Sequence, residues 1–369
     1  MRSLKEYSAP AAFGGEVAPK VVKESSAKPG KTMRQNNFDI VRLFLATMVV
    51  LIHTFDLSGS NSLLIIQRVI SPHVAVEGFF AISGFLIFGS YERCASLGEY
   101  FANRAWRILP GYWLSTIFCL LIAFSLGSFH VGKFLLANLS FATFLHPGID
   151  GVFESNPGNS VMNGALWTIK IEVGFYLLVP IIVWWCRRWH RDTVLLILLA
   201  ASIVYRVGMG DHEKLAIQLP GQLSFFLVGT LIYYHLDFFK KRGVWMMAGA
   251  AVCFGLHVWT GWFIFRPVAI SALTLGACLL LPQIKGPTRW GDFSYGTYIL
   301  HYPIIQVAVA AGLFRAHGWG ALLVILVIVG FAASLSWFFV EKPSLGHARS
   351  RRLRQSALGA TPNFPPAVP

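Results

Sequence analysis

Three ionisable side chains stand in one apolar run of the chain. Residues 39–53 predict a helix of the kind that crosses a membrane, yet they include Asp39, Arg42 and His53. An Arg or Asp at the centre of a bilayer costs about 2.5–3.5 kcal/mol even on the mildest insertion scales. Arg42 and His53 share one helical face, roughly 16 Å apart along the axis. Such a stripe must face protein or a water-filled cavity, which makes both residues catalytic candidates.

The alternative for this run is structural. Asp39 and Arg42 could extend to the membrane surface while a neighbouring helix caps His53. The choice between the two interpretations depends on the other polar residues that the apolar runs contain.

Two other apolar runs contain acids. Glu77 lies shortly before a small pair, Ser83 and Gly84, and Glu172 follows Trp167 in a later run. A lone acid inside a membrane needs a partner, so both glutamates are candidates for a functional role. The Ser-Gly pair lets a backbone or a ligand approach closely, although helix packing alone would also explain it.

A second histidine stands near the C-terminal end of the chain. In residues 290–303, Ser294, Tyr298 and His301 repeat on one helical face. Two histidines, two or three acids and an arginine inside apolar runs indicate a reaction or transport site in the membrane core.

Arg104 and Arg107 lie three residues apart, just before another apolar run. Helical spacing puts their guanidinium groups on one face, where they could grip a phosphate with paired hydrogen bonds. Anchoring to lipid headgroups explains the pair equally well.

The composition is that of a membrane protein. Of 369 residues, 55% are hydrophobic and 13% are charged, whereas soluble domains carry about 25% charged residues. The net charge of +14 does not indicate nucleic-acid binding, because the basic residues stand between and beyond the apolar runs. The five cysteines are scattered without metal-ligand spacing, and no metal is expected. The polar N-terminal stretch lacks the apolar core of a cleavable signal peptide.

We predict an all-α polytopic fold with about ten transmembrane helices and both termini inside. Residues 131–146 are too polar for a span and are expected to form a re-entrant or interfacial helix, since counting them as a span would place the basic groups at 187–191 and 240–242 outside. Residues 1–36 and 344–369 predict disordered basic tails around a membrane domain at 37–343. The candidate spans cover residues 39–57, 74–90, 110–126, 166–186, 193–208, 218–236, 244–260, 263–282, 293–313 and 320–340.

Taken together, these stretches resemble the acyltransferase 3 family of integral membrane O-acyltransferases. The family pattern of an Arg, ten residues and a His matches Arg42 and His53. One departure is that many members carry an Asp before the Phe-Phe pair, whereas here the acid is Glu77, one methylene longer and two residues before Phe79. The other family motifs match residues 79–86, 167–176, 294–303 and 341–343, in the family's order.

The resemblance implies an enzyme of the plasma membrane, the inner membrane of a bacterium. It would transfer an acyl group, with acetyl expected, from cytoplasmic acyl-CoA to a hydroxyl of a cell-surface or exported polysaccharide or lipo-oligosaccharide. Acyl-CoA is then a co-substrate, and no permanently bound cofactor is expected. Binding of nucleic acid is not expected. The resemblance leaves open whether the protein associates with polysaccharide synthesis or export machinery. Many members carry a C-terminal esterase-like domain, which is not expected in the 26 residues after Pro343.

The residues then suggest a mechanism. Arg104 and Arg107 would bind the CoA phosphates, and the pantetheine arm would pass Arg42. His53 would act as general base or take the acyl group, with Glu77 or Glu172 orienting the imidazole. The family pattern further marks His301 as catalytic, Ser83 and Gly84 as donor-binding, and Trp167 and Tyr298 as acceptor-binding. The alternative function is a proton-coupled transporter that uses the histidines and glutamates as a relay.

Overall fold

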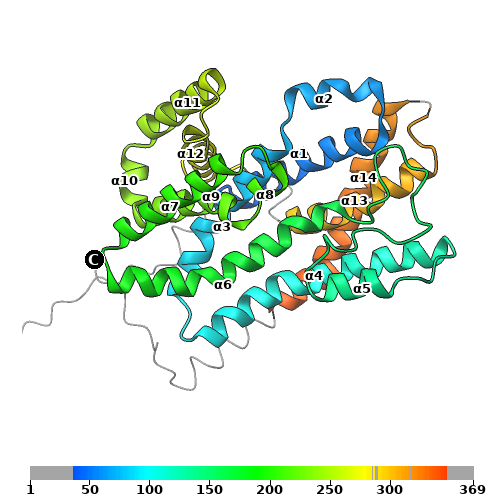
Figure 1. Cartoon of the computed structure of the whole chain (residues 1–369), viewed down its shortest axis with the longest axis horizontal. Helices are drawn as coiled ribbons and strands as arrows, with labels where there is room; N and C mark the ends of the chain where they lie inside the picture. The colour runs from blue at the N-terminus through cyan, green and yellow to red at the C-terminus, as the bar shows by residue number, and fades with distance from the viewer. Residues whose placement is uncertain (1–35, 285, 287–289, 316, 347–369) are drawn as a thin grey trace, which may run out of the picture. The chain divides into compact units, whose positions relative to one another are not determined.

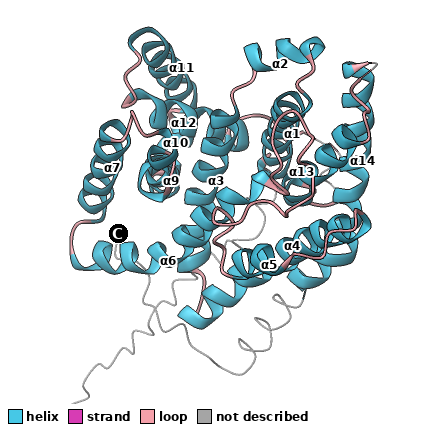
Figure 2. Cartoon of the chain, turned by 45° about the vertical axis from the view of Figure 1, so that its right-hand side comes forward, coloured by secondary structure: helices cyan, strands magenta, loops and turns pink. Residues whose placement is uncertain are grey.

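The structure, a computed structural model, describes residues 36–284, 286, 290–315 and 317–346. Within these residues the fold is all-helical, and no β-strand occurs (Figure 2). Apart from their innermost residues, the predicted tails at 1–36 and 344–369 lie outside the described part. In chain order the α-helices are α1 Phe38–Ser58, α2 Leu64–Val69, α3 Pro72–Glu92, α4 Leu97–Ser125, α5 Gly132–Leu139, α6 Trp167–Arg188, α7 Arg191–Gly208, α8 Glu213–Ala216, α9 Leu219–Tyr234, α10 Leu236–Lys241, α11 Gly243–Thr260, α12 Phe265–Leu279, α13 Ser294–Ala310 and α14 Gly318–Ser336.

Each of the ten predicted spans coincides with a helix of the structure (Figure 1). Among the described residues, seven helical stretches are long and apolar enough to cross a membrane, so the chain has the character of a multi-pass membrane protein. The count of ten spans and the inward position of both termini stay predictions. The seven stretches are 38–58, 73–92, 97–125, 164–188, 213–234, 243–260 and 318–346.

The segment predicted to be re-entrant or interfacial contains α5, a helix of eight residues. At 1.5 Å per residue it is about 12 Å long, too short to cross a bilayer. It lies along α4 (Figure 1), to which the Tyr112 hydroxyl ties it by donating to the Asn138 carbonyl oxygen at 2.9 Å.

The central helices pack through buried side chains and small residues. α13 is buried along most of its length, and it packs against α1, α4 and α14. α3 packs against α9, α12, α1 and α6. A Cβ atom at Gly84 would overlap the carbonyl oxygen of Phe226, and one at Gly229 would overlap that of Ala81. Glycine at both positions therefore lets the α3 and α9 backbones touch.

α4 begins with two capping hydrogen bonds that resemble a capping box. The Ser96 hydroxyl accepts from the Glu99 amide at 3.1 Å, and the Glu99 carboxylate accepts from the Ala95 amide at 2.7 Å. This cap fixes the helix start, so Arg104 and Arg107 follow on its second and third turns. The helix therefore presents both arginines to the α1–α3–α13 side of the protein.

Candidate active site

A cavity of about 360 Å³ lies between α1, α3, α4, α6 and α13. Its wall follows α3 from Val76 to Arg93, a length of roughly 25 Å at the helical rise. The hydrocarbon core of a bilayer is about 30 Å thick, so this length is comparable to most of a bilayer's depth. Its two ends differ in chemistry.

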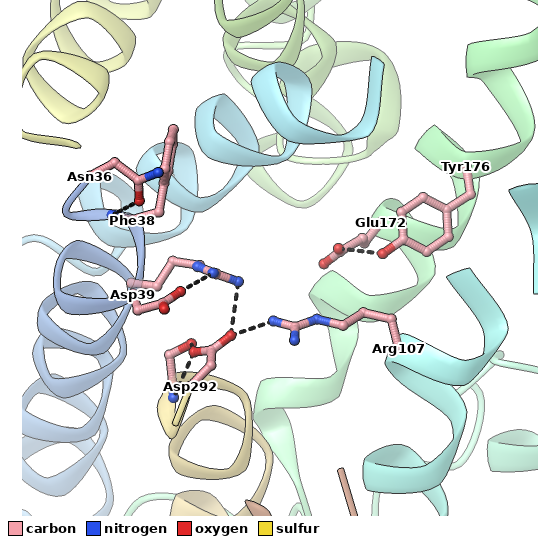
Figure 3. A network of polar contacts seen from close by, with 9 residues as sticks. Asn36, Phe38, Asp39, Arg107, Glu172, Tyr176 and Asp292 are labelled. Carbon is pink, nitrogen blue, oxygen red and sulfur yellow. Dashed lines mark hydrogen bonds and ion pairs between the residues drawn. The ribbon is translucent and has the colours of Figure 1, made fainter. Parts of the chain in front are cut away.

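One end of the cavity is lined by arginines, and we call Arg42, Arg93, Arg104 and Arg107 the arginine end. Arg42 and Arg107 meet at one carboxylate oxygen of Asp292, at 2.9 and 2.5 Å (Figure 3). Arg42 also forms an ion pair with Asp39 at 2.5 Å, although the Asp39 side chain is partly exposed. The ion pairs hold α1, α4 and the start of α13 together.

Asp292 lies in the connection just before α13 and is buried. Burial alone would raise the pKa of its carboxyl group, but the charges of Arg42 and Arg107 and the Ser294 hydroxyl outweigh this effect and hold the pKa below its ordinary value. Asp292 is therefore ionised at neutral pH and partly neutralises the arginine end.

The arginine end retains hydrogen-bond donors that the described residues do not satisfy. The Nε atoms of Arg42 and Arg104 are buried there without an acceptor. Arg104 donates from its Nη2 to the Ser90 hydroxyl at 3.0 Å, and its guanidinium lies 5.7 Å from the centre of the Tyr176 ring. A buried donor without a partner costs about 1–3 kcal/mol, so a ligand with anionic oxygens would stabilise this end.

Two hydroxyl groups that bond to each other line the cavity away from the arginine end. The side chains of Thr168 and Tyr298, which we call the closing pair, are 2.8 Å apart and join α6 to α13. Phe79 packs edge-on against the Tyr298 ring at a centroid distance of 5.7 Å. Behind Tyr298 lies His301, with ring centroids 6.0 Å apart, and His301 does not line the cavity.

His301 and His53 form a hydrogen-bonded pair, which we call the histidine pair. The Nδ1 atom of His53 lies 2.8 Å from the Nε2 atom of His301, across the α1–α13 contact. His301 is fully buried, whereas His53 is partly exposed and packs against the Tyr302 ring at 5.1 Å. The two histidines that the sequence singled out are thus brought together from positions 248 residues apart.

The hydrogen bonds assign the protons of the neutral pair. The Nδ1 atom of His301 lies 3.1 Å from the carbonyl oxygen of Thr297, which can only accept. His301 therefore donates from Nδ1 and accepts at Nε2. His53 must then donate from Nδ1, and its Nε2 atom keeps a lone pair. That nitrogen is the basic and nucleophilic atom of the pair.

Neither of the two glutamates predicted to orient His53 is hydrogen-bonded to it in the structure. Glu77 is fully buried and accepts from the Arg266 Nε at 2.9 and 3.0 Å, which fastens α3 to α12. Glu172 accepts from the Tyr176 hydroxyl at 2.7 Å and lines the cavity. Both acids are used by other partners, and His301 takes the place that a carboxylate was expected to fill.

The remaining predicted residues divide between the cavity and the packing around it. Ser83 and Tyr298 line the cavity. Gly84 lies against the Phe226 backbone and does not line the cavity, so its predicted donor-binding role stays a prediction. Trp167 begins α6, one residue before Thr168, and does not line the cavity.

Three residues of this region were not identified from sequence. Asp292 stands in the Trp-Gly-Asp-Phe-Ser stretch, where a carboxylate directly before an apolar run was the available signal. Thr168 follows Trp167 in a family motif but carries no spacing signal of its own. Arg266 is the partner that a buried Glu77 required, and it lies 189 residues away in sequence.

Comparison with known proteins gives one family. A family model described as an acyltransferase domain matches residues 35–341. Nodulation protein 10 of Rhizobium leguminosarum bv. viciae is 28% identical over 84% of this chain and 93% of its own length. An O-acetyl transferase of Shigella phage Sf6 is 27% identical over 84% and 96%. The exopolysaccharide production protein ExoZ of Rhizobium meliloti (strain 1021) is 27% identical over 77% and 93%. No solved structure matches.

Proposed function

The chain belongs to the acyltransferase 3 family and is an O-acetyltransferase-like enzyme, and on this premise we propose that it moves an acyl group, acetyl in the simplest case, from cytoplasmic acyl-CoA to a hydroxyl of a cell-surface or exported carbohydrate. The observation that carries the proposal is the long cavity with arginines at one end and the histidine pair just beyond the other. A relative named for exopolysaccharide production supports a carbohydrate acceptor.

The arginine end supports a CoA donor. Four arginines line it, and two of their donors lack acceptors among the described residues. Phosphates of CoA would take up these donors, with Arg104 as the arginine that no described carboxylate neutralises. The pantetheine arm would lie along α3, so the thioester would approach Tyr298.

The histidine pair supports general-base chemistry. The Nε2 atom of His53 would accept the proton of the acceptor hydroxyl while that oxygen attacks the thioester carbonyl. The C–S bond then breaks, and the imidazolium proton passes to the leaving thiolate, which departs as CoA. His301 would stabilise the charged His53 by accepting its Nδ1–H.

A covalent route uses the same atom. The Nε2 atom of His53 would attack the thioester, CoA would leave, and the acceptor hydroxyl would then take the acyl group from the imidazole. Brief exposure of the protein to labelled acyl-CoA without acceptor, followed by acid quench, separates the routes. Label on His53 indicates the covalent one.

The test of the function is mass spectrometry of envelope glycans. Cells with the intact gene, without it, and with His53→Ala are compared, with the variant's membrane insertion checked by immunoblot. We expect ester-linked acyl groups with the intact gene alone. Acylation that persists in cells carrying a normally inserted His53→Ala protein would contradict the proposal.

A further inference from the structure

We propose that a second cavity, on the connection between α1 and α3, binds a neutral sugar residue of the acceptor. This connection pocket has a volume of about 410 Å³. Its polar side chains are Asp56, Gln67, Arg68 and Ser71, beside apolar residues that include Ile52 and Ile70. The inference rests on the proposed function, because it supplies the acceptor site for the same reaction.

The pocket adjoins the histidine pair through α1 and α13. Asp56 follows His53 by one turn on α1, about 4.5 Å along the axis and on the same side of the helix. Tyr302, whose ring packs against His53, has its hydroxyl within electrostatic range of Asp56. The cavity of the candidate active site, which we call the donor cavity, is lined on α1 by Arg42, which precedes His53. The connection pocket is lined on the same helix by Asp56, which follows His53.

The lining determines the class of ligand. Asp56 and Arg68 carry opposite charges at one pocket, yet they form no ion pair with each other. Asp56, Gln67 and Arg68 are exposed, and within the described ranges their side chains form no hydrogen bond with the protein. A carboxylate only accepts and a guanidinium only donates, whereas sugar hydroxyls do both. The two charges sum to zero and supply one acceptor and one donor group, which a neutral polyhydroxylated ligand matches on both sides.

The position also meets the geometric demand of the reaction. A general base must lie within about 2.6–3.2 Å of the hydroxyl oxygen it deprotonates. A ring held by Asp56 and Arg68 has hydroxyl groups on neighbouring carbons, one of which can turn toward His53. Under the predicted orientation the pocket is on the outer side of the membrane, where a surface glycan would arrive.

The experiment uses the full chain in lipid nanodiscs with radiolabelled acetyl-CoA. The acceptor is envelope polysaccharide from cells that lack the gene, treated with mild alkali to remove existing esters. Asp56→Asn and Arg68→Gln are compared with the matched surface variants Asp150→Asn and Arg315→Gln, which lie on other connections. The substituted side chains of the pocket have no described partners, and thermal unfolding checks that each variant is folded.

We expect Asp56→Asn and Arg68→Gln each to raise the KM for polysaccharide about tenfold or more, as the loss of a charged hydrogen bond predicts. Their KM for acetyl-CoA and the matched variants should stay within about twofold of wild type. Polysaccharide KM values that are unchanged in both pocket variants overturn the inference. Label recovered only on anionic sugars overturns the assignment of a neutral sugar as the ligand. A wild-type protein that transfers no label overturns the proposed function itself.

Discussion

At the scale of residues, the tautomer of His53, the proposed base, depends on its neighbour. The carbonyl of Thr297 sets the proton of His301, and His301 in turn sets the proton of His53. In hydrolases with a catalytic triad a carboxylate performs this task. A neutral imidazole places no fixed negative charge in the membrane core, where an unpaired carboxylate would be costly.

Substitution of the histidine pair should separate chemistry from positioning. We expect His53→Ala to lower kcat by roughly 10²–10⁴-fold, the usual contribution of a general base. His301→Gln keeps an oxygen that can accept from the His53 Nδ1–H, so it should retain more activity than His301→Leu. The measurement is kcat for acetyl transfer across pH, with KM for acetyl-CoA as control. A His301→Leu protein with the wild-type pH profile would refute the positioning role.

Substitution of Arg104 in the proposed donor site should weaken acetyl-CoA binding selectively. Arg104→Gln removes a charge that no described carboxylate neutralises, so KM for acetyl-CoA should rise roughly tenfold to a hundredfold. Arg188→Gln, on the exposed end of α6, is the matched control and should leave KM unchanged. Equal KM values for both variants would remove Arg104 from the donor site.

Substitution of Asp292 should destabilise the folded protein over a defined pH range. Asp292→Asn leaves Arg42 and Arg107 without their shared carboxylate, which should destabilise the protein by about 3–5 kcal/mol. The folded-state pKa of Asp292 lies below its unfolded value, so its stabilisation is complete above the ordinary carboxyl range of about 3.9 and is lost only as pH falls through the lower folded pKa. The difference in Tm between wild type and variant should therefore be equal at pH 5 and pH 8. A difference that disappears by pH 5 would contradict the assignment.

At the scale of elements, the α3–α9 crossing depends on the absence of a side chain. Gly84→Ala places a Cβ atom against the Phe226 carbonyl oxygen, so the helices must separate, at a cost of about 1–3 kcal/mol or more. Gly249→Ala on α11 meets open space and is the matched control, expected to leave Tm unchanged or slightly higher. Unfolding of both variants in detergent measures the effect, and equal Tm values would show that the crossing tolerates a methyl group.

Helices could be located from the sequence, whereas contacts between them could not. Apolar runs define the spans because a bilayer demands about twenty apolar residues, and the polar residues in them identified His53 and His301. The partner of Glu77 was missed because nothing local to α3 specifies Arg266 on α12. The closing pair likewise joins α6 to α13 across 130 residues. Such pairings depend on how whole helices pack against each other. The spacing of residues within one helix does not predict this packing.

At the scale of the whole molecule, the proposed donor and acceptor approach from opposite ends. The donor cavity, the histidine pair and the connection pocket succeed one another along α1. We therefore expect sealed inside-out vesicles to consume added acetyl-CoA, and sealed right-side-out vesicles to do so only after permeabilisation. Equal rates in both intact preparations would contradict the predicted orientation.

The hydrogen bond between Thr168 and Tyr298 has a consequence for the cell's energy supply. A water-filled passage through an energised membrane would let protons run down their gradient, and each elementary charge that crosses dissipates about 2.3 kcal/mol per 100 mV. Both hydroxyl-bearing residues line the cavity, and the side chains of Phe79 and His301 pack around Tyr298. We therefore expect the closing pair to limit proton leakage through the cavity when no substrate is bound.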